Sequence, residues 1–336
     1  MKTKYTKEQI QTLKLVGILS ACLVILLILF IALMNKFSSP LPASIGAPVG
    51  ELNIKSGMPL AEAKAQLDKL GINYEVIPTE SKIANRVEKI EHDGKIQDGK
   101  TTLYVSSTVK LYGNEMDADK VVYLTFDDGP TYSNTFDILD TLDSYGIKAT
   151  FFVLGNRIEE YADRIKATNE RGHLIACHSY SHTLDRTSSN YVYASVNAMI
   201  NEIDDYENTL KLVLGNEAFN SIAKAFRFPG GSSTNGRISK AEAKEYISAI
   251  REKGYKIYDW TSLTGDAEGK STASEFIAHM SSGLDKAKSN DEPLIILMHD
   301  KLTTNEALSQ ILDYLVGNGY YFDTVDNCPE YVFAEQ

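Results

Sequence analysis

Basic side chains and cysteines are scarce in this chain. Its 336 residues carry 34 Lys and Arg against 45 Asp and Glu, which gives a formal net charge of -11. No run of Lys or Arg is interleaved with aromatic residues, so we expect no nucleic-acid surface and no polyanionic partner. Of the 3 cysteines, only Cys177 and Cys328 lie outside an apolar N-terminal segment. A disulfide scaffold is therefore excluded, and the spacing leaves only a single bridge open.

The long apolar run lies near the N-terminus. Residues 15–34 are twenty uncharged positions, mostly Leu, Ile, Val and Ala, and this length spans a hydrocarbon core of about 30 Å. Four lysines and one acidic residue precede it, and such a positive flank stays in the cytoplasm. We predict a cytoplasmic tail (1–14), a single-pass transmembrane helix (15–34) and an extracellular catalytic domain. A buried core helix or a cleaved signal peptide usually has a shorter or interrupted apolar run.

A linker and a small domain are expected next. Residues 35–45 are rich in Ser and Pro, as in a semi-rigid stalk. The segment Gly57-Met58-Pro59-Leu60 begins an amphipathic helix that stops at Gly71, and alternating patterns predict strands at 72–77, 86–90 and 102–105. This βαββ unit resembles a PASTA-like domain over residues 46–107. The resemblance implies a wall-facing module that serves as a binding domain or as a spacer.

The remainder, residues 119–336, alternates between strand and helix patterns. Short β-branched or aromatic runs predict seven strands, at 121–126, 149–154, 173–178, 225–228, 256–260, 294–299 and 320–325. Amphipathic runs predict helices at 135–145, 194–212, 240–253, 273–287 and 305–317. This alternation predicts an α/β domain with parallel strands, and in a β/α barrel the catalytic side chains gather at the C-terminal face.

Polar side chains follow four of these predicted strands. They are Asp127 and Asp128 after the first, His178 and His182 after the third, Arg227 after the fourth and His299 after the sixth. Each fragment alone has a structural explanation, such as a turn at Asp-Gly-Pro or a solvated pair of histidines. Together, Asp128, His178 and His182 form a two-His-one-carboxylate set with open positions. This set predicts a divalent metal site that also admits water and substrate.

Amide hydrolysis at such a site assigns roles to the neighbouring residues. Asp127 is expected to point to the other side of an extended backbone, where it is free to act as general base. Arg227 would orient this carboxylate by charge pairing. The Gly230 N–H is the candidate oxyanion donor, since Pro229 has no N–H to donate. His299 is the expected general acid for the leaving amine.

These residues resemble the five motifs of the NodB-homology polysaccharide deacetylases, carbohydrate esterase family 4. The matches are TFDDGP at 125–130, H-S-x-x-H at 178–182, R-x-P-x-G at 227–231, the fourth motif at 259–266 and L-x-H at 297–299. The resemblance implies a distorted (β/α)7 barrel and a divalent metal, zinc first, with cobalt or manganese as alternatives. It also implies that an Asp of the fourth motif tunes the acid histidine, and we assign this role to Asp266 rather than Asp259.

The departures from the family pattern concern the substrate groove. Gly230 replaces a common aromatic residue, and Ala267 stands where Trp often follows the tuning Asp. Aromatic surface for a sugar ring is then expected from three other residues, Trp260, Tyr180 and Phe228. Core packing is the alternative role for these three. Cys177 stands where family members often have Asn, and packing, metal ligation and oxidation are the roles open to it.

The anchor and the outward topology place this hydrolase beside the cell wall. We expect it to hydrolyse N-acetyl groups of a cell-wall polysaccharide, peptidoglycan N-acetylglucosamine in the first place. An O-acetyl esterase or a deacetylase of another surface glycan would use the same residues. A catalytically silent wall-binding scaffold is the alternative from another class, and the intact set of catalytic residues argues against it.

Overall fold

The computed structural model describes residues 48–97, 100–104, 107–233 and 237–336. The predicted cytoplasmic tail, transmembrane helix and linker lie outside this described part of the chain. Within it, no helix is both long enough and apolar enough to cross a bilayer.

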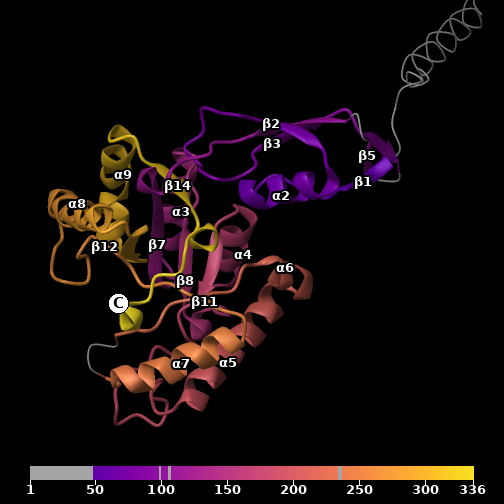
Figure 1. Cartoon of the computed structure of the whole chain (residues 1–336). Helices are drawn as coiled ribbons and strands as arrows, with labels where there is room; N and C mark the ends of the chain where they lie inside the picture. The colour runs from indigo at the N-terminus through magenta and orange to yellow at the C-terminus, as the bar shows by residue number, and fades with distance from the viewer. Residues whose placement is uncertain (1–47, 98–99, 105–106, 234–236) are drawn as a thin grey trace, which may run out of the picture.

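A central sheet of eight parallel strands forms the catalytic domain (Figure 1). Its hydrogen-bonded order is β11-β10-β9-β8-β7-β13-β12, and β14 pairs with β7 beside β8. The strands are β7 (Val121–Gly129), β8 (Thr150–Val153), β9 (Leu174–Cys177), β10 (Ala225–Phe226), β11 (Lys256–Ile257), β12 (Ser262–Leu263), β13 (Leu294–His299) and β14 (Tyr321–Asp323). All seven predicted strands are present, and β12 is an additional one.

The sheet curls into a partial barrel rather than a closed one. The two ends of the strand order, β11 and β12, are not paired with each other in the described residues. The predicted (β/α)7 barrel is corrected to this extent. The strands at the two open ends, β11 and β12, contain only two residues each and so offer few backbone donors and acceptors for pairing with each other.

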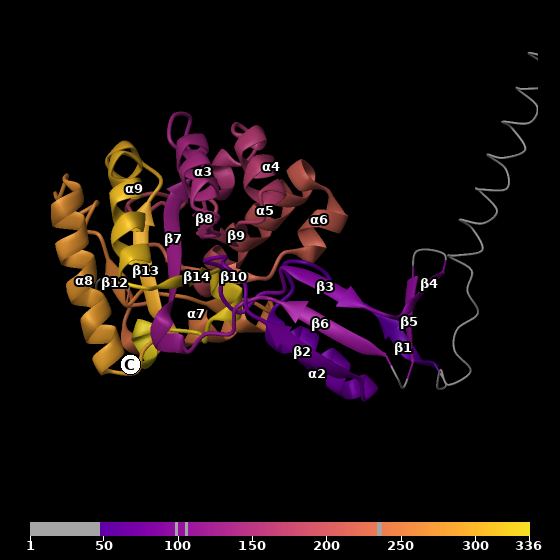
Figure 2. The ribbon, with the colours of Figure 1, turned by 90° about the horizontal axis from the view of Figure 1, so that it is seen from above.

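Helices cover the outside of the curled sheet (Figures 1 and 2). They are α3 (Thr135–Ser144), α4 (Ala162–Glu170), α5 (Val196–Leu214), α6 (Asn216–Ser221), α7 (Lys240–Glu252), α8 (Ala273–Ser289) and α9 (Leu302–Gly317). Ser239 and Thr272 begin α7 and α8 with capping boxes, which satisfy backbone donors that a helix start leaves free. Because helices pack on the sheet, strand β9 is buried along its whole length.

In its described residues, the N-terminal unit contains two small sheets and one helix. Its elements are β1 (Pro48–Leu52), α2 (Leu60–Leu70), β2 (Asn73–Ile77), β3 (Lys89–His92), β4 (Lys95–Gln97), β5 (Lys100–Tyr104) and β6 (Thr108–Tyr112). The sheets have the orders β1-β5-β4 and β2-β6-β3. Because β6 is the central strand of the second sheet, this unit extends beyond residue 107. The resemblance to a PASTA-like domain stays a prediction.

The N-terminal unit is joined to the catalytic domain at the β14 edge (Figure 2). Ile83 forms a parallel bridge with Phe322. The guanidinium of Arg86 donates to Asp323 at 2.9 Å and to Asp326 at 2.6 Å. Burial opposes the charge of Arg86, but these two carboxylates outweigh it and raise its pKa. This junction lies at the end of β14 and not among the predicted site residues.

Candidate active site

The predicted catalytic side chains meet at the C-terminal edge of the sheet. Parallel strands end at a common edge. Strand β7 carries Asp127 and Asp128 near its end, His178 directly follows β9, and His299 ends β13. Arg227 directly follows β10. Segments that are far apart in the chain therefore contribute to one site.

Asp128, His178 and His182 form a cluster that fits a divalent metal. One ligand atom from each lies within 4.8 Å of the others. The Asp128 Oδ1 atom is 3.6 Å from Nε2 of His178 and 3.7 Å from Nε2 of His182. This oxygen is buried and has no hydrogen-bond partner among the described residues. An unpartnered buried carboxylate oxygen facing two imidazole nitrogens is the donor set that a metal would satisfy.

Hydrogen bonds hold the ring of His178 and the backbone of His182. The Nδ1 atom of His178 lies 2.9 Å from the backbone oxygen of Arg227, which assigns the proton to Nδ1 and leaves the Nε2 lone pair for a metal. The backbone N–H of His182 donates to Ser179 Oγ at 3.0 Å. The ring of His178 is thus held by the loop after β10, and the backbone of His182 is held by its own loop.

The protonation states also suit metal ligands. Burial works against the charged carboxylate of Asp128, but His178 and His182 outweigh burial and lower its pKa. Burial and the neighbouring His178 lower the pKa of His182. Both shifts favour an anionic carboxylate and a neutral imidazole, the forms that bind metals.

Asp127 is buried and paired with Arg227. Nη1 of Arg227 donates to Asp127 Oδ1 at 2.8 Å and to Thr125 Oγ1 at 2.7 Å, and Nε donates to the backbone oxygen of Tyr258 at 2.8 Å. The second oxygen of Asp127, Oδ2, lies 3.6 Å from Nε2 of His178. Arg227 therefore holds one carboxylate oxygen and leaves the other facing the histidine cluster.

The expectation that Asp127 and Asp128 point to opposite sides is wrong. Oδ2 of Asp127 and Oδ1 of Asp128 lie at the same distance, 3.6 Å, from Nε2 of His178. Asp128 has a left-handed φ of +67°, and the register of β7 on β8 shifts between Asp127 and Gly129. This irregularity breaks the alternation of an extended strand and brings both carboxylates to one side.

His299 lies on the other side of the site and is bonded to Asp266. Its Nδ1 atom is 2.9 Å from Asp266 Oδ1, and its backbone N–H donates to Oδ2 at 2.8 Å. Burial works against the charged ring, but the hydrogen bond to Asp266 and the nearby carboxylates outweigh it and raise the pKa of His299. Asp259 instead accepts bonds from Ser232 and from the N–H of Phe333.

The three aromatic residues expected to bind sugar have different surroundings. Phe228 is 0% exposed and packs edge-on against Phe226, so its ring is not available to a substrate, and its predicted role is corrected to core packing. Tyr180 is half-buried beside Gly155. Trp260 is half-buried, with the ring of Phe333 5.0 Å away. The latter two keep some surface for a ligand.

One residue that supports the site was not identified from the sequence. Glu202, on α5, accepts hydrogen bonds from the N–H groups of Tyr180 at 2.8 Å and Ser181 at 2.6 Å. It thereby holds the loop between the two histidine ligands. In the sequence it is one acidic residue among several on an amphipathic helix, and no local pattern distinguishes it.

Cys177 serves as a packing residue in this structure. Cys177 and Cys328 are both free and buried, so the single disulfide bridge that the spacing left open is not formed. Burial raises the pKa of the Cys177 thiol well above its usual range, which keeps it in the protonated form that binds metals poorly.

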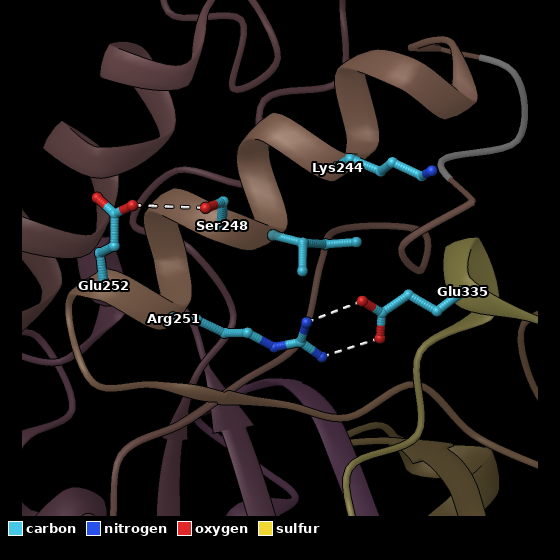
Figure 3. Close-up of a pocket in the computed structure, with 6 residues that line it drawn as sticks. Lys244, Ser248, Arg251, Glu252 and Glu335 are labelled. Atoms are coloured by element: carbon cyan, nitrogen blue, oxygen red, sulfur yellow. Dashed lines mark hydrogen bonds and ion pairs between the residues drawn. The ribbon is translucent and has the colours of Figure 1, made fainter.

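A separate pocket of about 510 Å³ lies between α7 and the C-terminal residues (Figure 3). Arg251 and Glu335 form a two-pronged ion pair across it, at 2.8 and 2.9 Å. No predicted catalytic or metal-ligating residue lines this pocket. It is therefore not the candidate active site.

The comparisons with known proteins point to one family. The model of the polysaccharide deacetylase family matches residues 114–249. A peptidoglycan-N-acetylglucosamine deacetylase of Bacillus cereus is 29% identical over 205 residues, which are 61% of this chain and 68% of that protein. A bifunctional xylanase/deacetylase of Pseudobutyrivibrio xylanivorans is 32% identical over 224 residues, 66% of this chain and 32% of that protein.

A solved structure extends the likeness to the fold. The catalytic domain of a peptidoglycan N-acetylglucosamine deacetylase from Eubacterium rectale is 32% identical, with a TM-score of 0.54. The match covers 63% of this chain and 92% of that domain. Nearly the whole of a deacetylase catalytic domain therefore has a counterpart here.

Proposed function

This chain belongs to the polysaccharide deacetylase family, and on that premise we propose that it hydrolyses N-acetyl groups of a cell-wall polysaccharide, with peptidoglycan N-acetylglucosamine as the substrate. The observation that carries the proposal is the Asp128, His178 and His182 cluster with the free oxygen of Asp127 facing it. The choice of glycan is supported by the names of the relatives in Bacillus cereus and Eubacterium rectale.

The residues of the cluster would hold a divalent ion, zinc first, with cobalt or manganese as alternatives. Such an ion supplies Lewis-acid activation of water and of the acetyl carbonyl. Asp127, held by Arg227, accepts the proton of the attacking water through its free Oδ2. The N–H of Gly230 donates to the oxygen that becomes negative in the transition state.

His299 then serves as the general acid. The raised pKa of His299 favours the protonated ring that a general acid needs, and Asp266 binds Nδ1 so that Nε2 is the donor. The leaving amine nitrogen takes this proton as the C–N bond breaks. The reaction thus adds one proton to Asp127 and removes one from His299. Asp127 must lose its proton and His299 must regain one before the next cycle.

Acetate release from purified peptidoglycan tests the proposal. The full-length chain, loaded with zinc, is compared with the Asp127→Asn variant, whose turnover should be lower by about 10² to 10⁴-fold because general-base catalysis contributes that much. If the wild type releases no more acetate than Asp127→Asn, the catalytic proposal fails and a wall-binding scaffold is favoured.

The substrate has a second candidate. The relative from Pseudobutyrivibrio xylanivorans is named a xylanase/deacetylase, which favours O-acetyl groups of a plant polysaccharide as the alternative. Peptidoglycan, chitin oligomers and acetylxylan can be compared in the same acetate assay. Turnover of acetylxylan alone would contradict peptidoglycan as the substrate.

The N-terminal regions extend the proposal to a location. The apolar residues 15–34 and the lysines before them support a single-pass anchor in the cell membrane with the catalytic domain outside. The PASTA-like unit would be a spacer or a binding module toward the wall. Deletion of residues 1–34 should move the protein out of the membrane fraction, and an unchanged distribution would contradict the anchor.

A further inference from the structure

The loop that carries the candidate oxyanion donor is a tight turn. The N–H of Gly231 donates to the backbone oxygen of Phe228 at 2.8 Å, and Gly230 has a φ of +80°. Pro229 at the second position and a left-handed Gly230 at the third are the signature of a type II turn. The central peptide of this turn joins Pro229 to Gly230.

The orientation of that central peptide decides where the Gly230 N–H points. Type I and type II turns differ mainly by a flip of the central peptide. In a trans peptide the carbonyl oxygen and the N–H point in opposite directions, and the Pro229–Gly230 bond is not among the cis bonds. Whatever holds the oxygen of Pro229 therefore also fixes the N–H of Gly230.

Tyr193 holds this oxygen. Its hydroxyl donates to the backbone oxygen of Pro229 at 2.8 Å in a buried position. Aromatic neighbours hold the Tyr193 ring, with Tyr246 at 5.9 Å and Phe228 at 6.4 Å between ring centroids. Burial raises the pKa of Tyr193 well above its usual range, so the hydroxyl keeps its proton and remains a donor.

The rest of the loop is held independently of Tyr193. The backbone oxygen of Arg227 lies 2.9 Å from Nδ1 of His178, and the N–H of Ser232 donates to Asp259 at 2.8 Å. The N–H of Gly230, in contrast, has no acceptor among the described residues. The turn thus presents one free donor, in a peptide whose opposite side is bonded to Tyr193.

We propose that Tyr193 is a positioning residue for oxyanion stabilisation, because it holds the Pro229–Gly230 peptide in the orientation that presents the Gly230 N–H to the reacting carbonyl. This inference rests on the proposed acetyl hydrolysis. A hydrogen bond accepted by the peptide oxygen also polarises the amide and strengthens its N–H as a donor. Tyr193 contributes without contact to the substrate.

The test is the Tyr193→Phe variant, which removes the hydroxyl and keeps the ring. Direct removal of an oxyanion donor costs about 10² to 10³-fold in kcat, and an indirect effect through the peptide should be smaller, about 10-fold. KM and the zinc affinity should not change, because the variant touches neither the substrate nor a ligand. Acetate release and zinc binding of the full-length chain measure these quantities.

Tyr191→Phe is the matched control. Tyr191 lies in the same aromatic cluster, 6.0 Å from Tyr193 between ring centroids, and its buried hydroxyl has no partner among the described residues. Its variant should keep the wild-type kcat. Equal kcat values for Tyr193→Phe and Tyr191→Phe would overturn the inference and leave the proposed function standing. A rise in KM or a loss of zinc in Tyr193→Phe, of the same size as its fall in kcat, would also overturn the inference, since either result indicates general damage to the site.

The failure of the proposed function has a different result. In that case the wild type itself is no more active than Asp127→Asn, and both proposals are overturned together. A wild type that exceeds Asp127→Asn, with a reduced kcat only in Tyr193→Phe, supports the positioning role.

Discussion

The two sides of the site hold a histidine in the same manner but with different acceptors. On the metal side, Nδ1 of His178 lies 2.9 Å from the backbone oxygen of Arg227. On the acid side, Nδ1 of His299 lies 2.9 Å from the carboxylate of Asp266. The distances are equal, and the two acceptors differ in charge.

A neutral acceptor and a charged one have different effects on an imidazole. A carbonyl fixes the ring and its tautomer but adds no negative charge, so Nε2 remains a lone-pair donor for a metal. A carboxylate stabilises the protonated ring, and although burial opposes the charge of His299, the hydrogen bond to Asp266 and the nearby carboxylates outweigh it and raise its pKa. We therefore expect the charge of the acceptor to separate ligand from acid within one site.

The largest effect should come from removing a histidine on each side. His178→Ala should lose zinc, with an affinity lower by more than about 100-fold, and lose activity with it. His299→Ala should retain zinc and lose turnover by about 10² to 10⁴-fold. Metal content of the purified variants, measured with acetate release, checks both. Retained zinc in His178→Ala would contradict the division between a metal side and an acid side.

Most of the fold could be predicted because its elements follow local patterns. The seven predicted strands correspond to seven observed ones, since apolar runs such as the one that became β13 are buried on both faces. Strand β12 was missed because Ser262 and Leu263 form no pattern on their own. The incomplete closure of the barrel depends on how these short strands pair, which no local pattern contains.

The site was predictable as a set of residues but not as a geometry. The motif spacing identifies Asp127 and Asp128, whereas the left-handed φ of Asp128 that brings them to one side comes from a strand irregularity. Phe228 was assigned to the groove on residue type, but its direction depends on packing against Phe226. The family resemblance led to Asp266 rather than Asp259, and Asp266 is the one that contacts His299, although both are buried.

Asp266→Asn sharpens the comparison by giving His299 a neutral acceptor like that of His178. The general acid must be protonated, so activity falls as pH rises through the pKa of His299. That pKa is raised in part by Asp266, and without this charge it should fall. The alkaline limb of the pH profile of kcat should move to lower pH. At pH values above the shifted limb, kcat should be about 10-fold lower than in the wild type.

Asp300→Asn is the control for this shift. Asp300 follows His299 in the chain and is buried, but its carboxylate accepts bonds from Thr131 and Thr135. Its variant should leave the alkaline limb in place. A limb that moves equally in both variants would show that the contact between Asp266 and His299 is not the cause.

The smallest effect should come from a substitution of Thr304, which contacts the acceptor Asp266 rather than the ring of His299. Its hydroxyl donates to Asp266 Oδ2 at 2.6 Å, a bond that stabilises the carboxylate and helps to lower its pKa. Thr304→Val removes this donor, while the N–H of His299 still bonds to Oδ2. The carboxylate becomes more basic and should raise the pKa of His299 further.

The alkaline limb of Thr304→Val should therefore move to higher pH, opposite to Asp266→Asn, with kcat at neutral pH within about 3-fold of wild type. Thr303→Val is the matched control, because the buried Thr303 hydroxyl has no partner among the described residues. The pH profiles of kcat are measured together for Thr304→Val, Asp266→Asn and Thr303→Val, and they show the direction in which each alkaline limb moves. A shift of Thr304→Val to lower pH would mean that the hydroxyl orients Asp266 rather than moderating its charge, and the charge of the acceptor would no longer suffice to explain the acid side.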